Sequence, residues 1–291
     1  MIIVRLAGGL GNQMFQYAFG RTLSIRHNIP LKIDTSFLER RDLYPGFVYR
    51  NYELDIFNTI KDFESNYDVE VFEQDLRYNQ EMVDNISRLT DSNIKIEGYF
   101  QSVKYFEEFE STIKSDFTFN NLVDDGDDKI KSMLSDIRDS NSVMINIRRT
   151  DFLNGDFHCV LGLDYINKGV DIIKSKIDNP KYFIFSDDIE WCQENIKLDN
   201  MVIVDHSYKG DRFSYYLQLM KECKNFIIPN SSFAWWAAWL SDNDDKIIIA
   251  PEKWLNDDSI STEDLVPKSW IIIWKKQEPV VRYTQIQKQI N

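Results

Sequence analysis

The chain has 291 residues, of which 43% are hydrophobic and 14% aromatic, and its net charge is −13. It is long enough for two domains of ordinary size, and this composition excludes disorder as a global state. The negative charge disfavours nucleic acid and anionic lipid as partners of the whole surface. An anionic small ligand would need a local concentration of arginines.

The cysteines and the N-terminus indicate a cellular compartment. Cys159, Cys192 and Cys223 are too sparse for a disulfide framework and lack the spacing of a zinc site, which favours a reducing environment. The first residues show none of the features of a signal peptide. No window reaches the roughly 18 apolar residues of a membrane span. We therefore expect a cytoplasmic protein, which could lie peripherally on the inner face of a membrane.

The first hundred residues predict a β-α-β unit followed by a further strand and helix. Strands are expected at 2–6 and 30–37, with a helix over 12–25 between them. The stretch "AGGLGNQ" joins the first strand to that helix and has the outline of a nucleotide-binding loop. Residues 40–60 show no clear period. The segment 93–117 predicts a strand, a turn at Gly98 and a helix.

The acidic, turn-rich segment "NNLVDDGDDKI" (residues 120–130) is the best candidate for a linker. Its Asp-Gly-Asp sequence at 125–127 raises the possibility of a metal site. A solvated loop or the start of a helix is the preferred interpretation, because nothing nearby supplies further ligands. The expected domains are residues 1–139 and 140–291.

The second part of the chain alternates between strands and helices. Expected strands lie at 142–149, 181–188, 201–205, 225–230 and 246–251, and expected helices at 163–177, 189–196, 211–223 and 231–241. The strands are rich in Ile and Val, which predicts parallel sheets with helices on both faces. The fold class is therefore α/β, with two Rossmann-like domains facing across a cleft. Residues 275–291 are expected to form a loose tail or a packed final strand. Ligands of such sheets bind at the carboxyl ends of strands.

The stretch "INIRRTDF" places Arg148 and Arg149 at such a strand end, followed by Asp151. The planar guanidinium group matches phosphate oxygens bidentately, so the pair is a candidate diphosphate clamp. One buried Arg–Asp ion pair and one surface arginine would explain the spacing equally well.

Two further strand ends carry polar residues. Asn230, Ser231 and Ser232 stand where a helix begins, and the free N–H groups there can bind an anion, although a simple serine cap is the alternative. The tryptophans of this helix, at 235, 236 and 239, are expected in the core. Ser186 and Asp187 precede another helix, where an acid can bind a ribose or a guanine edge or can cap the helix. His27, His158 and His206 show no metal spacing.

The motifs together resemble the bacterial α-1,2-fucosyltransferases of glycosyltransferase family 11. The similarity runs along nearly the whole chain through "GGLGNQMFQYAFG", "GYFQSVKYF", "NIRRTD", "CVLGLDY", "FIFSDD" and "NSSFAWWAAWL". It implies a GT-B-like fold and transfer of fucose from GDP-fucose to the 2-hydroxyl of a terminal galactose, with inversion. It also implies that no metal or other cofactor is required. The expected acceptor is a galactose-terminated oligosaccharide or a lipid-linked glycan.

The resemblance implies roles for individual residues. Arg148 and Arg149 would hold the diphosphate, Ser231 and Ser232 would add donors to it, and Asp187 would lie near the nucleoside. Asn146, Ser186 and Asn230 complete the expected donor site. The family usually has histidine at position 146, and asparagine can donate a hydrogen bond there but cannot shuttle a proton. A positioning role is therefore expected.

Inverting transfer also needs an acceptor for the proton of the attacking hydroxyl, and a carboxylate is the natural base. Asp151 is the first candidate and Asp156 the second. Asp151 could instead brace an arginine, and a late loss of the acceptor proton could make a strong base unnecessary.

The glycine cluster does not have the spacing of a dinucleotide site, since Met14 stands at the last glycine position of G-x-G-x-x-G. We expect Gly9, Gly11, Asn12 and Gln13 to face the acceptor side of the cleft. Two other functions stay open at this point. One is a transferase of the same fold with another GDP-sugar or a protein acceptor, and the other is a non-catalytic carbohydrate-binding protein that uses the tryptophan-rich helix.

Overall fold

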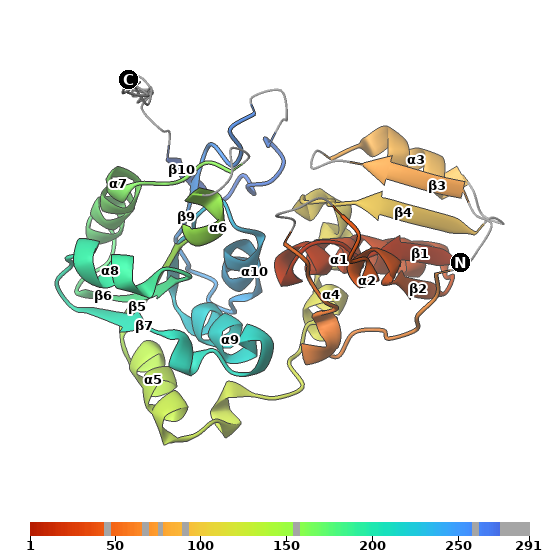
Figure 1. Ribbon diagram of the computed structural model, residues 1–291. Helices are drawn as coiled ribbons and strands as arrows, with labels where there is room; N and C mark the ends of the chain where they lie inside the picture. The colour runs from red at the N-terminus through yellow and green to blue at the C-terminus, as the bar shows by residue number, and fades with distance from the viewer. Residues whose placement is uncertain are drawn as a thin grey trace, which may run out of the picture.

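A computed structural model describes residues 1–43, 48–65, 70–74, 78–88, 93–153, 158–257 and 262–273, without the side chain of Asp151. The predicted tail at 275–291 lies outside these residues. Two parallel sheets lie side by side, one formed by the N-terminal part (residues 1–116) and one by the C-terminal part (residues 128–273) (Figure 1). The α/β class with parallel sheets is thus confirmed.

The N-terminal part has a four-stranded sheet in the order β2-β1-β4-β3. Its elements are β1 (Ile2–Arg5), α1 (Leu10–His27), β2 (Leu31–Asp34), α2 (Ser36–Glu39), β3 (Glu70–Gln74), α3 (Gln80–Arg88), β4 (Ile94–Gly98) and α4 (Glu110–Asp116). The sequence analysis did not predict β3 or α3. In this part of the chain β3 is an edge strand that pairs only with β4, and its largely exposed side chains give it little apolar signal.

The C-terminal part has a six-stranded sheet in the order β10-β9-β8-β5-β6-β7. Its helices are α5 (Asp128–Asp139), α6 (Thr150–Leu153), α7 (Leu163–Lys174), α8 (Ile189–Asn195), α9 (Ser214–Glu222) and α10 (Ser232–Leu240). Its strands are β5 (Asn141–Ile147), β6 (Pro180–Ser186), β7 (Met201–Val204), β8 (Asn225–Ile227), β9 (Ile248–Pro251) and β10 (Ile271–Ile273).

Successive residues of the strands point to opposite faces of the sheet. In β5, Val143 and Ile145 pack into a cluster with α7 and α8, whereas Met144 packs into a larger cluster with α5, α9 and α10. Both faces are therefore covered, as the Ile- and Val-rich strands predict. The first sheet differs, because Lys95 and Glu97 of β4 form an ion pair on the face opposite its apolar core.

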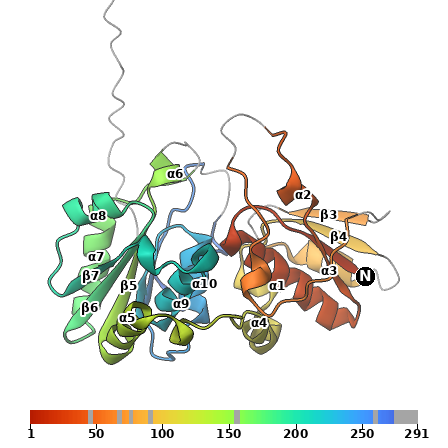
Figure 2. The ribbon, with the colours of Figure 1, turned by 60° about the horizontal axis from the view of Figure 1, so that its bottom comes forward.

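The larger cluster continues from one part of the chain into the other. Helix α10 lies against α1, and both stand between the two sheets (Figures 1 and 2). The ring of Phe15 on α1 lies 4.7 Å from Trp235 and 4.8 Å from Trp236, measured between ring centroids. Both tryptophans are fully buried. The expectation that they belong to the core is confirmed, and the interface between the two parts is an apolar one.

The acidic segment at 120–130 contains the start of a helix rather than a metal site. The carboxylate of Asp127 caps α5 by accepting a hydrogen bond from the N–H of Ile130 at 2.9 Å. Helix α5 then packs on the second sheet, where its Asp136 binds Lys181 at 2.6 Å. The division into domains after residue 139 stays a prediction, and the contacts of α5 lie with the C-terminal part.

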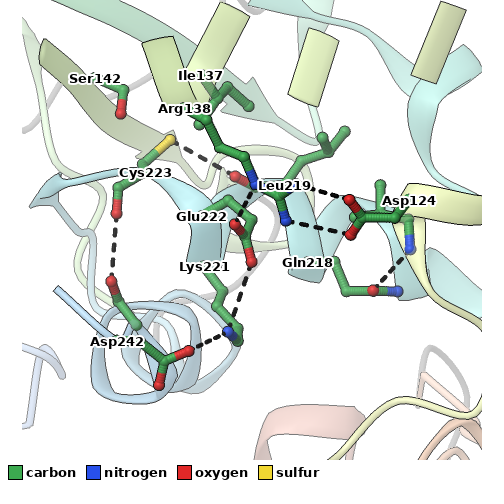
Figure 3. A network of polar contacts seen from close by, with 12 residues as sticks. Asp124, Ile137, Arg138, Ser142, Gln218, Leu219, Lys221, Glu222, Cys223 and Asp242 are labelled. Carbon is green, nitrogen blue, oxygen red and sulfur yellow. Dashed lines mark hydrogen bonds and ion pairs between the residues drawn. The ribbon is translucent and has the colours of Figure 1, made fainter. Parts of the chain in front are cut away.

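Arg138 of α5 is the centre of an ion-pair network that holds this segment (Figure 3). Its guanidinium group binds Asp124 at 2.7 Å and Glu222 of α9 at 2.8 Å. Lys221 lies 3.6 Å from Glu222 and extends the network to Asp242 at 2.8 Å. The network therefore joins the segment between the two parts to α9 and to the residues after α10.

Replacing Arg138 by alanine is expected to lower the free energy of unfolding by about 1 kcal/mol, because the two pairs are largely exposed. Arg138 holds the pKa of Asp124 below its ordinary value of 3.8. This stabilisation is present above that value and is lost as the pH falls through the lower pKa of the folded state. Urea unfolding at pH 7 and pH 3 measures it. If the free energies of unfolding of the variant and wild type differed more at pH 3 than at pH 7, the assigned ion pair between Arg138 and Asp124 would be contradicted.

Candidate functional site

A cavity of about 930 Å³ lies between the two parts of the chain and takes its walls from both. A ligand of the size of a sugar nucleotide fits a volume in this range. The N-terminal part contributes Gly8–Asn12, Val48, Arg50–Glu53, Tyr99 and Gln101. The C-terminal part contributes Asn146–Arg148, Phe152, His158, Ser186, Asp187, His206, Arg212, Phe213, Tyr216, Asn230–Phe233, Trp254, Leu255 and Leu265.

The topology of the two sheets explains why the cavity lies there. In the second sheet, chain order runs outward in both directions from the neighbouring strands β5 and β8. Arg148 follows β5, and Asn230 to Ser232 follow β8. In the first sheet the inner strands are β1 and β4, and the glycine loop and Tyr99 follow them. Chain order runs outward there from β1 to β2 and inward from β3 to β4. Ligands of open α/β sheets bind where the order reverses, at the carboxyl ends of such strands. Here the reversal point of the second sheet and the carboxyl ends of β1 and β4 open into one cavity.

The glycine loop forms the contact between the strand ends of the two sheets. A Cβ atom at Gly11 would lie 2.5 Å from the backbone N of Phe233, so only glycine allows α1 to approach α10 this closely. The indole N–H of Trp236 donates to the Gly11 carbonyl at 3.0 Å. The hydroxyl of Ser232 donates to Asn12 Oδ1 at 2.8 Å. Gly9, Gly11 and Asn12 line the cavity, and their place on the acceptor side stays a prediction.

Gln13 does not face the cavity, contrary to the expectation for the acceptor side. Its side chain is fully buried and its amide donates to the carbonyls of Gly8 and Asn51, at 2.9 and 2.8 Å. Its Oε1 accepts a hydrogen bond from the backbone N–H of Glu53 at 2.9 Å. Because these bonds occupy the amide, Gln13 positions the segment 51–53 rather than a ligand.

Two helices begin at the cavity. Helix α1 has 18 residues and α10 has 9, and the first N–H groups of a helix are unpaired donors with a partial positive charge. Ser231 precedes α10 but does not cap it with its side chain, so its hydroxyl is not used within the helix. Ser231 and Ser232 line the cavity. The combination of the helix N-termini and the Ser231 hydroxyl favours an anionic ligand.

The two arginines of the "NIRRTD" motif lie in different places. Arg148 lines the cavity, with its Nε 3.4 Å from Asp187 and its guanidinium group 5.7 Å from the ring of Phe152. Arg149 points to α8, where it stacks on Trp191 at 4.0 Å and lies 3.3 Å from Asp188. It is not among the residues that line the cavity. The site therefore brings together Arg148 and the α10 N-terminus, but not Arg149.

Asp187 and Ser186 join β5 to β6. The carboxylate of Asp187 accepts hydrogen bonds from the backbone N–H groups of Arg149 and Thr150, at 2.9 and 3.2 Å, and from the Thr150 hydroxyl at 2.6 Å. The Ser186 hydroxyl donates to the Ile147 carbonyl at 3.0 Å. Both residues line the cavity, and their hydrogen bonds fix the turn that carries Arg148.

Two asparagines of the expected donor site also line the cavity. Asn146 donates to the Phe185 carbonyl at 3.1 Å, which is compatible with positioning, although that role stays a prediction. Asn230 is buried and donates to the carbonyls of Cys159 and Trp254, at 2.9 and 2.6 Å. Its bonds fix two loops at the rim. Asp156 and the side chain of Asp151 lie outside the described residues.

The sequence analysis missed several lining residues. Tyr99 and His206 follow strands, so the rule that ligands bind at strand ends could have found them. Arg212 and Phe213 have left-handed backbone, with φ of 47° and 61°, which no sequence pattern indicated. Such backbone is uncommon outside glycine and gathers at functional sites. Arg212 forms an ion pair with Asp55 and donates to the Tyr52 carbonyl at 3.3 Å, so it spans the two parts.

The charge of the cavity differs in sign from that of the chain. Of the described charged side chains in its walls, three are the arginines Arg50, Arg148 and Arg212, and two are the acids Glu53 and Asp187. Within the described residues there is no group of three side chains suited to hold a metal ion. Nor does that part of the chain contain a helix long and apolar enough to cross a membrane.

Comparison with known proteins identifies relatives along the whole chain. The family model of "Glycosyl transferase family 11" matches residues 1–274. An α-1,2-colitosyltransferase from Escherichia coli is 31% identical, over 94% of this chain and 99% of its own length. The O-antigen biosynthesis glycosyltransferase WbnK, also from Escherichia coli, is 27% identical, over 91% of this chain and 98% of its own. Mouse galactoside α-(1,2)-fucosyltransferase 1 is 25% identical over 56% of this chain and 46% of its own.

Among solved structures, the fucosyltransferase NodZ from Bradyrhizobium has a similar fold. The TM-score is 0.50, at 14% sequence identity, and the similarity covers 81% of this chain and 92% of NodZ. This likeness supports the GT-B-like fold alone. The match of the family model to residues 1–274 and the relative that is 31% identical show that the chain belongs to glycosyltransferase family 11.

Proposed function

We propose that this enzyme transfers L-fucose from GDP-fucose to the 2-hydroxyl of a terminal galactose, with inversion, and forms an α-1,2 linkage. One observation carries the proposal. The reversal point of the second sheet and the carboxyl ends of β1 and β4 open into one cavity, whose walls include two helix N-termini and Arg148 in a chain of net charge −13. Such a site suits a ligand that carries a diphosphate and a sugar. The names of two relatives, a colitosyltransferase and a galactoside fucosyltransferase, share the α-1,2 linkage.

In this proposal the C-terminal part binds the donor across the second sheet. The diphosphate lies between Arg148 and the first N–H groups of α10, with the hydroxyl of Ser231 as a further donor. The hydroxyl of Ser232 is donated to Asn12 instead, contrary to the expectation that it would bind the diphosphate. The nucleoside lies toward the end of β6, near Ser186 and Asp187. Arg149 acts indirectly, because its contacts with Asp188 and Trp191 hold α8 against the turn that carries Arg148. The two domains would then face each other across the cavity.

These groups would stabilise the leaving group. As the bond between the sugar and the diphosphate breaks, negative charge grows on the departing phosphate oxygen. Arg148 and the N–H groups of α10 are held in place before the reaction, so they stabilise this charge without reorganising. The glycine loop and the segment 50–53 form the wall of the cavity that comes from the N-terminal part. The acceptor galactose would bind at this wall. Inversion follows if the acceptor attacks from that side.

A second donor has a specific observation in its favour. The relative that is 31% identical over nearly its full length is named an α-1,2-colitosyltransferase, so GDP-colitose is a candidate donor for the same site. Transfer to lactose from GDP-fucose, GDP-colitose and GDP-mannose, measured as GDP release and product mass, separates the donors. We expect GDP-fucose to have the highest kcat/KM. A higher value for either other donor would overturn the donor assignment.

A non-catalytic carbohydrate-binding function loses its structural basis, since Trp235 and Trp236 are fully buried and cannot stack on a ligand. The thermal unfolding of the protein with and without GDP provides a check. GDP is expected to raise Tm in a concentration-dependent way, because it binds only the folded state. Stabilisation by galactosides with no effect of GDP would favour a lectin.

A further inference from the structure

We propose that Glu53 is the general base that accepts the proton of the attacking hydroxyl group. This inference rests on the proposed function, since it assigns a role within the same cavity. Glu53 belongs to the N-terminal part, whereas Arg148 and Ser231 belong to the C-terminal part. The base would thus come from one part of the chain, and the groups that hold the leaving group from the other. A displacement with inversion requires this separation, because the acceptor and the leaving group lie on opposite sides of the sugar.

The cavity offers few carboxylates for this role. Among the described residues in its walls, the carboxylates are those of Glu53 and Asp187. The oxygens of Asp187 accept three hydrogen bonds from the turn at 149–150, and Arg148 lies beside them. Asp187 is therefore committed to the turn. Glu53 forms no ion pair within 4.0 Å among the pairs of the described residues, and the hydrogen bond that its carboxylate accepts from the N–H of Leu10 leaves further lone pairs for a ligand.

The backbone around Glu53 is fixed by the buried amide of Gln13. Gln13 accepts the N–H of Glu53 at 2.9 Å and donates to the carbonyl of Asn51 at 2.8 Å. Glu53 also directly precedes the 3-10 turn η1 (Leu54–Ile56), whose Leu54 is fully buried. A catalytic group needs this kind of support, because a misplacement of about 1 Å can cost 10²-fold in rate. The segment thus presents a defined carboxylate on the acceptor side.

The surroundings of Glu53 bring its pKa closer to neutral pH. Burial raises the pKa above the ordinary value of 4.5, and the negative charge of Asp55 raises it further. Arg50, Arg212 and the N–H of Leu10 at the start of α1 oppose this and favour the ionised form. A carboxylate with a raised pKa is a stronger base, and it remains ionised at neutral pH as long as the pKa stays below 7.

The proposed step balances in atoms and charge. The galactose oxygen attacks the anomeric carbon of the donor sugar and forms the new glycosidic bond. The bond from that carbon to the β-phosphate oxygen breaks, and its electron pair leaves with GDP. The proton of the hydroxyl moves to a carboxylate oxygen of Glu53, which later releases it to water. Arg148 and α10 stabilise the charge that GDP gains.

The test is the pH dependence of the Glu53→Gln variant. Glutamine keeps the size of the side chain and an acceptor for the Leu10 N–H, but it cannot take up the proton. We expect kcat to fall at least about 10²-fold, while KM for GDP-fucose and Tm stay near those of wild type. In wild type, kcat should decline on the acid side as Glu53 becomes protonated, and the variant should lack this decline. Glu53→Asp should restore part of the activity.

Asp55→Asn is a matched substitution two residues away. Asp55 does not line the described cavity, and its negative charge raises the pKa of Glu53. Removing that charge should move the acid-side decline of kcat to lower pH, with a much smaller loss of the maximal rate than in Glu53→Gln. A purely structural role of Glu53 as a partner of the α1 N-terminus would not produce this shift.

Three results would overturn the proposal. One is an unchanged acid-side decline in Glu53→Gln, and another is a loss of Tm large enough to explain the lost rate. The third is loss of that decline in Asp151→Asn or Asp156→Asn while Glu53→Gln keeps it. Wild-type transfer is measured first. If wild type transfers sugar but Glu53→Gln does so equally well, only the role of Glu53 is wrong. If wild type transfers no sugar from any GDP-sugar, the proposed function is wrong as well.

Discussion

Replacing Arg148 by alanine is expected to lower kcat about 10²- to 10³-fold while the protein still folds. The guanidinium group follows β5 at the reversal point of the second sheet and lines the cavity beside the N-terminus of α10. Alanine removes a fixed positive charge where the departing diphosphate gains a negative one. Arg148→Lys keeps the charge but loses the planar fork, so we expect only partial recovery.

Steady-state kinetics with GDP-fucose and lactose, together with Tm, check this prediction, and Arg149→Ala is the matched comparison. The sequence motif treats the two arginines alike, whereas the structure places Arg149 on Trp191 and Asp188. Arg149→Ala should therefore lower Tm more than Arg148→Ala and lower kcat less. A larger fall of kcat in Arg149→Ala than in Arg148→Ala would refute the placement of the diphosphate beside Arg148.

Replacing Gly11 by alanine should impair both stability and catalysis. The new Cβ would lie 2.5 Å from the N of Phe233 and 2.5 Å from the carbonyl carbon of Ser232, both backbone atoms of α10 or its first turn. Alanine stabilises a helix by up to about 1 kcal/mol relative to glycine. The steric overlap at this position outweighs that gain, because overpacking costs about 1–3 kcal/mol. The two helix N-termini must move apart. Because α10 would hold the diphosphate and the start of α1 supports Glu53, we also expect kcat to fall about 10²-fold.

Gly9→Ala is the control for this prediction. At Gly9 the backbone φ is −80°, and the nearest atoms to a new Cβ are those of the Arg50 guanidinium group, at 3.8 and 3.9 Å. The free energy of unfolding should stay within about 0.5 kcal/mol of wild type. Urea unfolding of both variants measures the difference. Equal stabilities of Gly11→Ala and Gly9→Ala would contradict the close packing of α1 on α10.

Much of the fold could be predicted because apolar strands and the residues that end them are local signals. Strands such as β5 and β6 consist of buried Ile, Val and Phe, and nearly every expected helix of the C-terminal part begins within a few residues of its predicted start. The edge strand β3 lacks this signal, since it buries little of its surface. The charged face of the first sheet, with its Lys95–Glu97 pair, also had no local indication.

Site residues at the ends of strands could be predicted from the sequence. The direction in which an individual side chain points could not. Arg148, Asn146, Ser231 and Ser232 line the cavity as the motifs indicate. Nothing local distinguishes Arg148 from Arg149, because only the position of Trp191 on α8 draws the second arginine away. The sequence predicts that Gln13 contacts a ligand. In the structure its amide bonds the backbone of Asn51 and Glu53, which lie about forty residues away in the chain. Its role depends on tertiary structure.

The glycine loop shows the same limit. Its spacing argues against a dinucleotide site, and that reasoning agrees with the structure, in which Gly11 serves close packing on α10. The loop contributes to the cavity through Gly9 and Asn12, and its other amides hold the segment 51–53. It therefore joins the two parts of the chain and positions Glu53, a residue that lies in a segment without any clear sequence pattern.

The central claim is that this cavity joins fucose to the 2-hydroxyl of galactose with inversion. NMR analysis of the product formed from GDP-fucose and lactose tests it most directly, because it reports both the anomeric configuration and the attachment site. The account predicts a single trisaccharide with an α-linked fucose on the 2-hydroxyl of galactose. A β-linked product, or fucose attached to any other hydroxyl group, would contradict it.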